Sequence, residues 1–277
     1  MGIGRQPIVA ANTFTGKMNN DRCFIFGRAE TAAALRLHRL LTLAALSLAC
    51  ATSAYAYRPF DGTDASVAEP GVFELEAGVG SSHEGAGRSL SFPALVANFG
   101  FANDVEFVIE ARLDRHSSDE APQYRNSLAD MALSVKHVWR RGTLQGDSGA
   151  SVASECGVLL PDQDAQPGTG WTCAGIVSNR WDSFVLHLNG GMTRTRTHST
   201  TRSLGLIAEG ADSSALRPVA ELLGERDTRG DWSRSVLMGM IWRRSAALSF
   251  DVGARFGSSS AGRIKELRAG LTWSVDP

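Results

Sequence analysis

The side chains in this sequence that could do chemistry are carboxylates, basic groups and one imidazole that alternate with apolar residues. A period of two places such side chains together on one face of a β-strand, opposite an apolar face. If strands of this kind close into a barrel, their charged faces meet in the interior and pair across neighbouring strands. The residues assigned to this interior are Glu76, Glu106, Glu110, Arg112, Lys136, His187, Asp251, Arg255, Glu266 and Arg268.

A charged interior of this kind could have either of two functions, and the sequence does not decide between them. The first is a wet path or binding site through which a small solute passes. The second is a network that fills the interior and only stabilises it, so that the loops outside the barrel carry the function. Neither use needs a cofactor. The six histidines lie far apart without metal-ligand spacing, so no metal site is expected either.

Catalysis is a third use, and the spacing of the residues does not support it. Some twelve-stranded outer-membrane phospholipases pair a His with a Ser near an Asn-Gly sequence, and His187-Leu188-Asn189-Gly190 is superficially similar. Asn189 stands where that Ser would be needed, so the nucleophile has no place. We therefore predict no catalytic residue and no enzyme, and a lipid-modifying enzyme ranks third among the candidate functions.

The elements that must position these residues are β-strands. Strict alternation marks segments 72–80, 104–114, 247–257 and 264–275. Weaker alternation predicts further strands near 90–99, 128–139, 149–160, 171–179, 183–195, 203–209, 215–225 and 235–243. No segment shows a convincing amphipathic helix. The even total of twelve predicts an all-β fold, an antiparallel up-and-down transmembrane barrel.

The connections and the tryptophans support a barrel in a membrane. Long polar connections are expected at 81–89, 115–126, 161–170, 195–202, 226–234 and 258–263, with short turns such as 100–103, 180–183 and 244–246 between them. Long outer loops and short periplasmic turns are typical of outer-membrane barrels. The turn at 139–147 is longer than this pattern expects. Five tryptophans fall near strand ends, as in an interfacial girdle: Trp139, Trp171, Trp181, Trp242 and Trp273.

A leader precedes the barrel. Basic residues from Arg36 to Arg39, an apolar run over 40–49 and the sequence Ala54-Tyr55-Ala56 together predict a secretory signal peptide. We therefore expect an N-terminal extension plus signal peptide over 1–56, cleavage near Ala56 and Tyr57, and a barrel over 57–277. A membrane anchor is the alternative, but the run is shorter than the roughly 20 residues needed to span a bilayer. Attachment of lipid at Cys50 is a weaker alternative.

Two cysteines remain in the mature chain, Cys156 and Cys173. They flank the loop at 161–170 at similar distances, so the two strands of a hairpin would place them opposite each other. In an oxidising compartment such a pair forms a disulfide, and two buried thiols are the alternative.

The last strand carries a further signal. The spacing of Arg268, Gly270, Trp273 and Val275 resembles the C-terminal signal of bacterial outer-membrane barrels, which implies the barrel-assembly machinery as a partner. The other expected partners are outer-membrane lipid and a small-molecule solute. The mature chain has more acidic than basic residues and gives no electrostatic reason to bind nucleic acid.

Several strings in the mature chain resemble a family of proteobacterial outer-membrane proteins. They include Arg58-Pro59-Phe60-Asp61-Gly62-Thr63, Phe250-Asp251-Val252-Gly253-Ala254-Arg255 and Arg268-Ala269-Gly270-Leu271-Thr272-Trp273. The family is usually described as transporters and is similar to the MetA-pathway phenol-degradation barrel proteins. The resemblance implies the outer membrane of a Gram-negative bacterium and passage of small compounds, including hydrophobic or aromatic ones. It supplies no catalytic residues and does not include the cysteine pair.

Overall fold

The structure, a computed structural model, describes residues 58–118, 125–163 and 166–275. The predicted signal peptide, its cleavage site and Cys50 lie outside the described residues. Within the described ranges no helix is long and apolar enough to cross a membrane.

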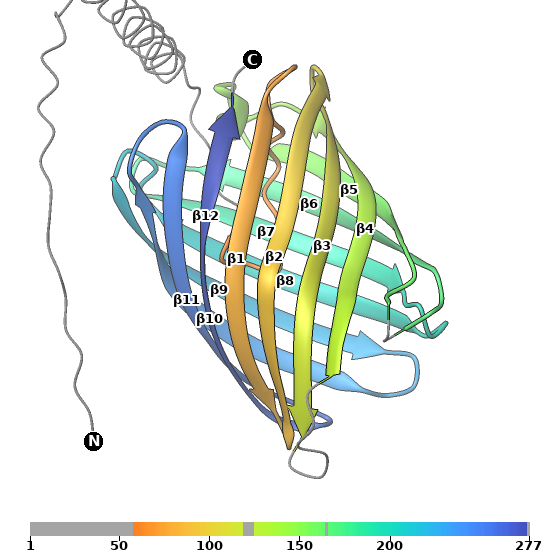
Figure 1. Cartoon of the computed structure of the whole chain (residues 1–277). Helices are drawn as coiled ribbons and strands as arrows, with labels where there is room; N and C mark the ends of the chain where they lie inside the picture. Colours follow the sequence, from red (N-terminus) through yellow and green to blue (C-terminus); the bar gives the residue numbers. More distant parts are fainter. Residues whose placement is uncertain (1–57, 119–124, 164–165, 276–277) are drawn as a thin grey trace, which may run out of the picture. The chain divides into compact units, whose positions relative to one another are not determined.

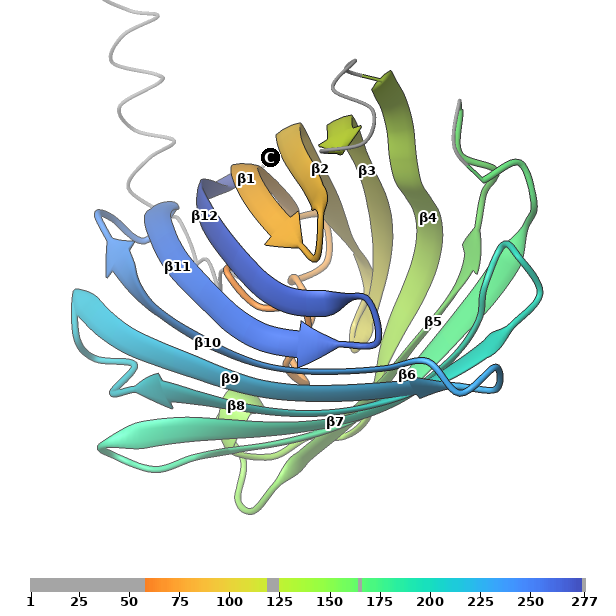
Figure 2. The same cartoon turned by 90° about the horizontal axis from the view of Figure 1, so that it is seen from below.

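Twelve antiparallel strands form one closed barrel, as predicted (Figures 1 and 2). Each strand pairs with its neighbours in the sequence, and the last strand closes the barrel against the first, with Phe73 opposite Val275. The strands are β1 (Phe73–Glu84), β2 (Gly87–Ala102), β3 (Val105–Ser118), β4 (Arg125–Arg140), β5 (Ser151–Leu159), β6 (Gly170–Arg180), β7 (Phe184–Arg194), β8 (Thr200–Gly210), β9 (Leu216–Asp227), β10 (Trp232–Arg243), β11 (Leu248–Ser259) and β12 (Gly262–Val275).

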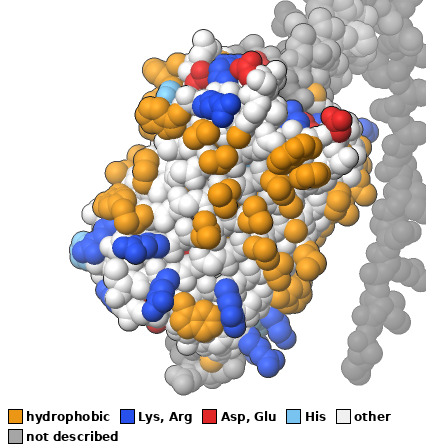
Figure 3. All heavy atoms as spheres, turned by 180° about the vertical axis from the view of Figure 1, so that it is seen from behind, with side chains coloured by type: hydrophobic (Ala, Val, Ile, Leu, Met, Phe, Trp, Pro, Cys, Tyr) orange, Lys and Arg blue, Asp and Glu red, His pale blue; other side chains and the backbone are white. Residues whose placement is uncertain are grey.

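The alternation in the sequence sorts side chains between the two faces of the wall. In β10, Leu237 and Ile241 are fully buried, whereas Met238 between them is 62% exposed. Inward positions are mostly polar and outward positions mostly apolar, the inverse of a soluble protein. Figure 3 shows hydrophobic side chains spread over the middle of the wall. An apolar surface of this extent needs lipid or another protein to cover it.

The tryptophans lie on the outside, near the two ends of the barrel. We call the end that holds Phe73 and Val275 the terminal rim, and the other end the distal rim. Trp242 and Trp273 lie toward the terminal rim, whereas Trp171 and Trp232 start their strands at the distal rim, and all four are exposed. This arrangement is typical of an aromatic girdle at two membrane interfaces.

The expectation that long and short connections alternate was wrong. β1 and β2 are joined by residues 85–86 alone, and β11 and β12 by residues 260–261, where long loops were expected. The polar residues assigned to these loops continue the strands instead, because pairing persists through positions such as His83 with Arg88. The long connection 141–150 lies at the terminal rim and holds the short 3-10 helix η2 (Thr143–Gln145).

Candidate functional site in the barrel lumen

Residues 58–72, which precede the first strand, run inside the barrel, and we call them the plug segment (Figure 2). The plug is not part of the sheet, so inward side chains of the wall bind its backbone. The amide groups of Asp61 and Gly62 donate to Glu221, with a shortest distance of 2.8 Å from Gly62 N to Oε1. Thr63 and Asn189 exchange two hydrogen bonds, of 2.9 and 2.8 Å.

Further along the plug, Ala65 N donates to Ser178 Oγ at 3.0 Å, and Ala68 N donates to Glu106 Oε2 at 2.6 Å. Buried backbone groups without a hydrogen-bond partner destabilise the fold. These wall residues therefore supply the hydrogen bonds that a neighbouring strand would otherwise make with the plug. The plug therefore has a defined seat, made by side chains of β3, β6, β7 and β9.

Arg58 enters a slot made by two glycines that face each other across the closing pair of strands. Gly78 of β1 is the register partner of Gly270 of β12, and a Cβ at either position would overlap the Arg58 side chain. Arg58 Nη2 also donates to the backbone oxygen of Ala269 at 3.3 Å, and its Nε lies 3.5 Å from Asp251. The slot explains why these inward positions carry no side chain.

Asp61 connects the plug to a charged cluster on the wall. Its two carboxylate oxygens lie 2.8 Å from Arg255 Nη2 and 2.7 Å from Arg268 Nη1. Burial opposes the charge on Asp61, but the guanidinium groups of Arg268 and Arg255 outweigh it and hold its pKa below the ordinary value. The plug is therefore held by charge as well as by its backbone.

The same arginines bind carboxylates of the wall. Arg255 is 4% exposed and lies 2.6 Å from Glu221 Oε2, while Arg268 lies 2.6 Å from Glu266 Oε2. On the other side of the plug, Lys136 Nζ lies 3.3 Å from Asp64 and donates to Thr63 Oγ1 at 3.0 Å. Buried charges require partners of this kind, because desolvation is otherwise too costly.

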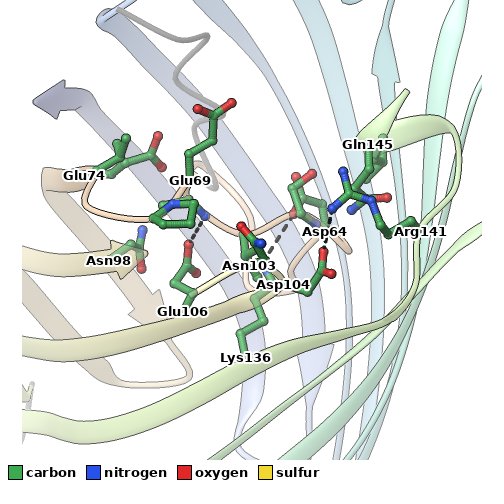
Figure 4. Close-up of a pocket in the computed structure, with 16 residues that line it drawn as sticks. Asp64, Glu69, Glu74, Asn98, Asn103, Asp104, Glu106, Lys136, Arg141 and Gln145 are labelled. Atoms are coloured by element: carbon green, nitrogen blue, oxygen red, sulfur yellow. Dashed lines mark hydrogen bonds and ion pairs between the residues drawn. The ribbon is translucent and has the colours of Figure 1, made fainter. Parts of the chain in front are cut away.

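A cavity of about 560 Å³ lies between the plug and the wall toward the terminal rim; we call it the terminal cavity. Figure 4 shows Glu106 and Lys136 reaching from the wall toward the plug. Among its charged lining residues carboxylates predominate, and the lining includes Asp64, Glu69, Glu74, Asp104, Glu106, Lys136 and Arg141. In this lining Lys136 pairs with Asp64 and Arg141 with Asp104, and carboxyl groups outnumber basic groups by five to two.

A second cavity, of about 240 Å³, lies toward the distal rim, and we call it the distal cavity. It has a more even balance of charges than the terminal cavity. Arg112 lies 2.9 Å from Asp114 and 3.0 Å from Asp130. The charged residues of its lining are Arg58, Asp61, Glu110, Arg112, Asp130, Glu266 and Arg268. Arg58 and Asp61 of the plug belong to this lining, so the plug borders both cavities.

The long connection 141–150 also belongs to the site. Gln145 Nε2 donates to the backbone oxygen of Ala65 at 2.7 Å, and Leu144 packs against the buried group of Ala65, Val138 and Ile176. This connection is long because it folds against the plug. Its length did not fit the sequence pattern, and its contacts with the plug explain the exception.

The structure places six of the ten predicted interior residues in two groups around the plug. Asp251, Arg255, Glu266 and Arg268 lie together around the start of the plug, and Glu106 and Lys136 lie around its later part. Glu76 accepts a bond from Asn98, and His187 contacts Ser178 and Glu209. Glu110 and Arg112 line the distal cavity.

Sequence reasoning missed the plug and part of its seat. Asn189 was considered only for catalysis, and Glu221 was not among the predicted interior residues, because apolar residues lie on both faces of β9. The signal that could have found the plug is the polar, non-alternating run around Asp61 and Asp64, directly before the first strand.

The cysteines lie on the outside of the barrel. Cys156 of β5 is the register partner of Cys173 of β6, and the structure joins their Sγ atoms in a disulfide.

Comparison with known proteins gives a fold but no family. No protein-family model matches the sequence, and no curated protein matches it. Among solved structures, the barrel is similar to an outer membrane channel from Pseudomonas putida F1, with a TM-score of 0.59 and 8% identity over 78% of this chain and 99% of that one. The NanC porin gives a TM-score of 0.53 and 8% identity over 72% of this chain and 98% of that one. The shared feature is the fold.

Proposed function

We propose that this protein is a channel for small solutes in the outer membrane of a Gram-negative bacterium, with the plug segment as its constriction. The observation that carries the proposal is the pair of cavities with charged residues in their lining that the plug borders, inside a wall whose outer surface is apolar. An outer-membrane barrel with an even number of strands has both ends of its chain in the periplasm, so the terminal rim faces the periplasm. The similarity to the P. putida outer membrane channel and to the NanC porin supports this proposal.

The charges of the cavities favour small polar or cationic solutes. The lining of the terminal cavity has five carboxyl groups and two basic groups, and an excess of one charge sign attracts the opposite ion. The family resemblance suggested hydrophobic or aromatic compounds, and the lining does include apolar side chains such as Val67, Val72 and Leu144, but its carboxyl groups outnumber its basic groups. We therefore place a polar solute ahead of a hydrophobic one.

A second candidate is a barrel whose lumen stays filled and which acts through its outer connections. The seat of the plug favours this candidate, because many hydrogen bonds and two arginines hold the segment. An arginine also stiffens the outer connections. Arg196 of connection 195–199 donates to the backbone oxygens of Leu160 and Met131 at 2.6 and 2.9 Å.

Conductance across a planar lipid bilayer tests the two candidates. The variant Arg58→Ala/Asp61→Ala removes two of the three charged anchors of the plug and leaves Asp64, and Arg244→Gln in the exposed turn 244–247 is the matched control. Under the channel proposal the wild type and the control conduct equally, with preference for cations, and the double variant conducts severalfold more. If none of the three conducts although each migrates on a gel as a folded, heat-modifiable barrel, the filled lumen is the better description.

A further inference from the structure

Three arginines lie together on the outside of the barrel near the distal rim, and we call them the arginine cluster. Arg202 of β8 and Arg226 of β9 are direct register partners, so two like charges stand opposite each other. Arg234 of β10 is the partner of Gly224, which lies two residues before Arg226 on the same face. All three side chains are exposed, and Figure 3 shows basic side chains gathered toward this end of the wall.

The arginine cluster has no carboxylate partner within the parts of the chain that the structure describes. Arg202 and Arg226 make no side-chain contact of their own there, and Arg234 reaches only Ser258 Oγ, at 3.4 Å, and the ring of Trp232. On the opposite rim, by contrast, the exposed Arg141 is paired with Asp104 and Asp147. Like charges directly opposite each other in a sheet are destabilising, so this arrangement needs an anion from outside the chain.

An apolar hollow of about 700 Å³ adjoins the arginine cluster on the same outer surface. Arg234 contributes to its lining, and the exposed apolar side chains of the lining are Leu188, Leu204, Leu206, Leu222 and Phe256. Gly224 lies in the middle, between its partners Leu204 and Arg234. No atom lies within 4 Å of the place where a Cβ of Gly224 would stand, so the hollow is open there.

We propose that the arginine cluster and the hollow together bind one phosphorylated lipid of the outer leaflet. The guanidinium groups hold its phosphate, since arginine binds phosphate through paired, charge-assisted hydrogen bonds. An acyl chain lies in the hollow, over Gly224. A free phosphate would fill the charged part only and leave the apolar part uncovered. The site rests on the proposed outer-membrane location, which puts the distal rim at the leaflet that faces outward.

The test uses the full protein in detergent and a glucosamine-disaccharide lipid that carries two phosphates, with binding followed by native mass spectrometry. Arg202→Gln/Arg226→Gln removes two of the three charges, Gly224→Leu fills the hollow, and Arg244→Gln at the terminal rim is the control. We expect the double variant to bind the lipid about tenfold more weakly, as lost charge-assisted hydrogen bonds require. Gly224→Leu should also weaken lipid binding, and the control should match the wild type.

Two additional ligands identify the source of the phosphate. The same lipid without its phosphates should bind wild type and double variant equally weakly, and inorganic phosphate should not displace the phosphorylated lipid at equal concentration. Equal binding of the phosphorylated lipid by wild type and double variant, each migrating as a folded barrel, overturns the proposal. Displacement by inorganic phosphate overturns the role of the hollow. Conductance is measured on the same proteins, so a barrel that binds the lipid but does not conduct refutes the channel and leaves this site standing.

Discussion

Arginine side chains have different partners on the two faces of the barrel wall. Inside, Arg255 lies within 2.8 Å of the carboxylates of both Glu221 and Asp61. Outside, Arg226 stands opposite Arg202 without a carboxylate among the residues described. A charge in the lumen is enclosed by the chain and must find its partner there. A charge at the outer edge of the apolar surface can take its partner from the membrane. The two arginines therefore have different functions, although both lie on strands of one sheet.

The largest effect is expected from breaking the inner pairing. Arg255→Met should lower the free energy of unfolding by about 3–5 kcal/mol, because it leaves Glu221 buried without its cation. Urea unfolding of the barrel in lipid vesicles measures this change. The variant Arg255→Met/Glu221→Gln should recover much of the loss, since neither charge then remains. A single variant as stable as the wild type would show that the interior is wet enough to solvate Glu221.

A smaller effect is expected from placing a charge in the middle of the outer face. Met238→Arg should lower the free energy of unfolding by about 2–4 kcal/mol, the cost reported for arginine near the bilayer midplane. Met238 points outward between Ala220 and Ala254, whereas the native Arg234 on the same face lies closer to the distal rim. The control is Met238→Leu, which keeps the surface apolar. Equal stability of the two variants would mean that lipid does not cover this part of the wall.

The smallest effect is expected from a single neutral contact with the plug. Asn189→Ala removes both hydrogen bonds to Thr63 and leaves the backbone of the plug without a partner there. We expect a loss of about 1–3 kcal/mol, together with faster cleavage of the plug by added protease. Asn189→Asp keeps the acceptor for Thr63 N but places a second acceptor against Thr63 O, so it should lose at least as much stability. No change in cleavage rate would show that the charged anchors Arg58, Asp61 and Asp64 are enough to keep the plug in place.

The barrel itself could be predicted because the pattern that encodes it is local. In each strand polar side chains point inward and apolar side chains point outward. Residues such as Leu248, Phe250 and Val252 show this alternation within a single strand, without information on the neighbouring strands. The interior residues followed from the same rule. Strand ends could not be predicted, because pairing continues through polar residues such as His83 that look like loop in isolation.

The contacts of the plug could not be predicted because its partners are distant in the sequence. Thr63 binds Asn189 and Asp61 binds Arg268, and nothing around 58–72 marks these partners. The connection 141–150 looked too long for the same reason, since its role depends on Ala65, far away in the chain. Period-two patterning describes a wall, but it carries no information on what occupies the space that the wall encloses.

The slot for Arg58 has a consequence for the order of assembly. Its two glycines lie near opposite ends of the chain, Gly78 in the first strand and Gly270 in the last. The slot therefore does not exist until β12 has joined β1 and the circle is complete. Arg58 can be seated only in a finished barrel, so a segment made before every strand is the last to find its place, and its arrival reports that closure has occurred.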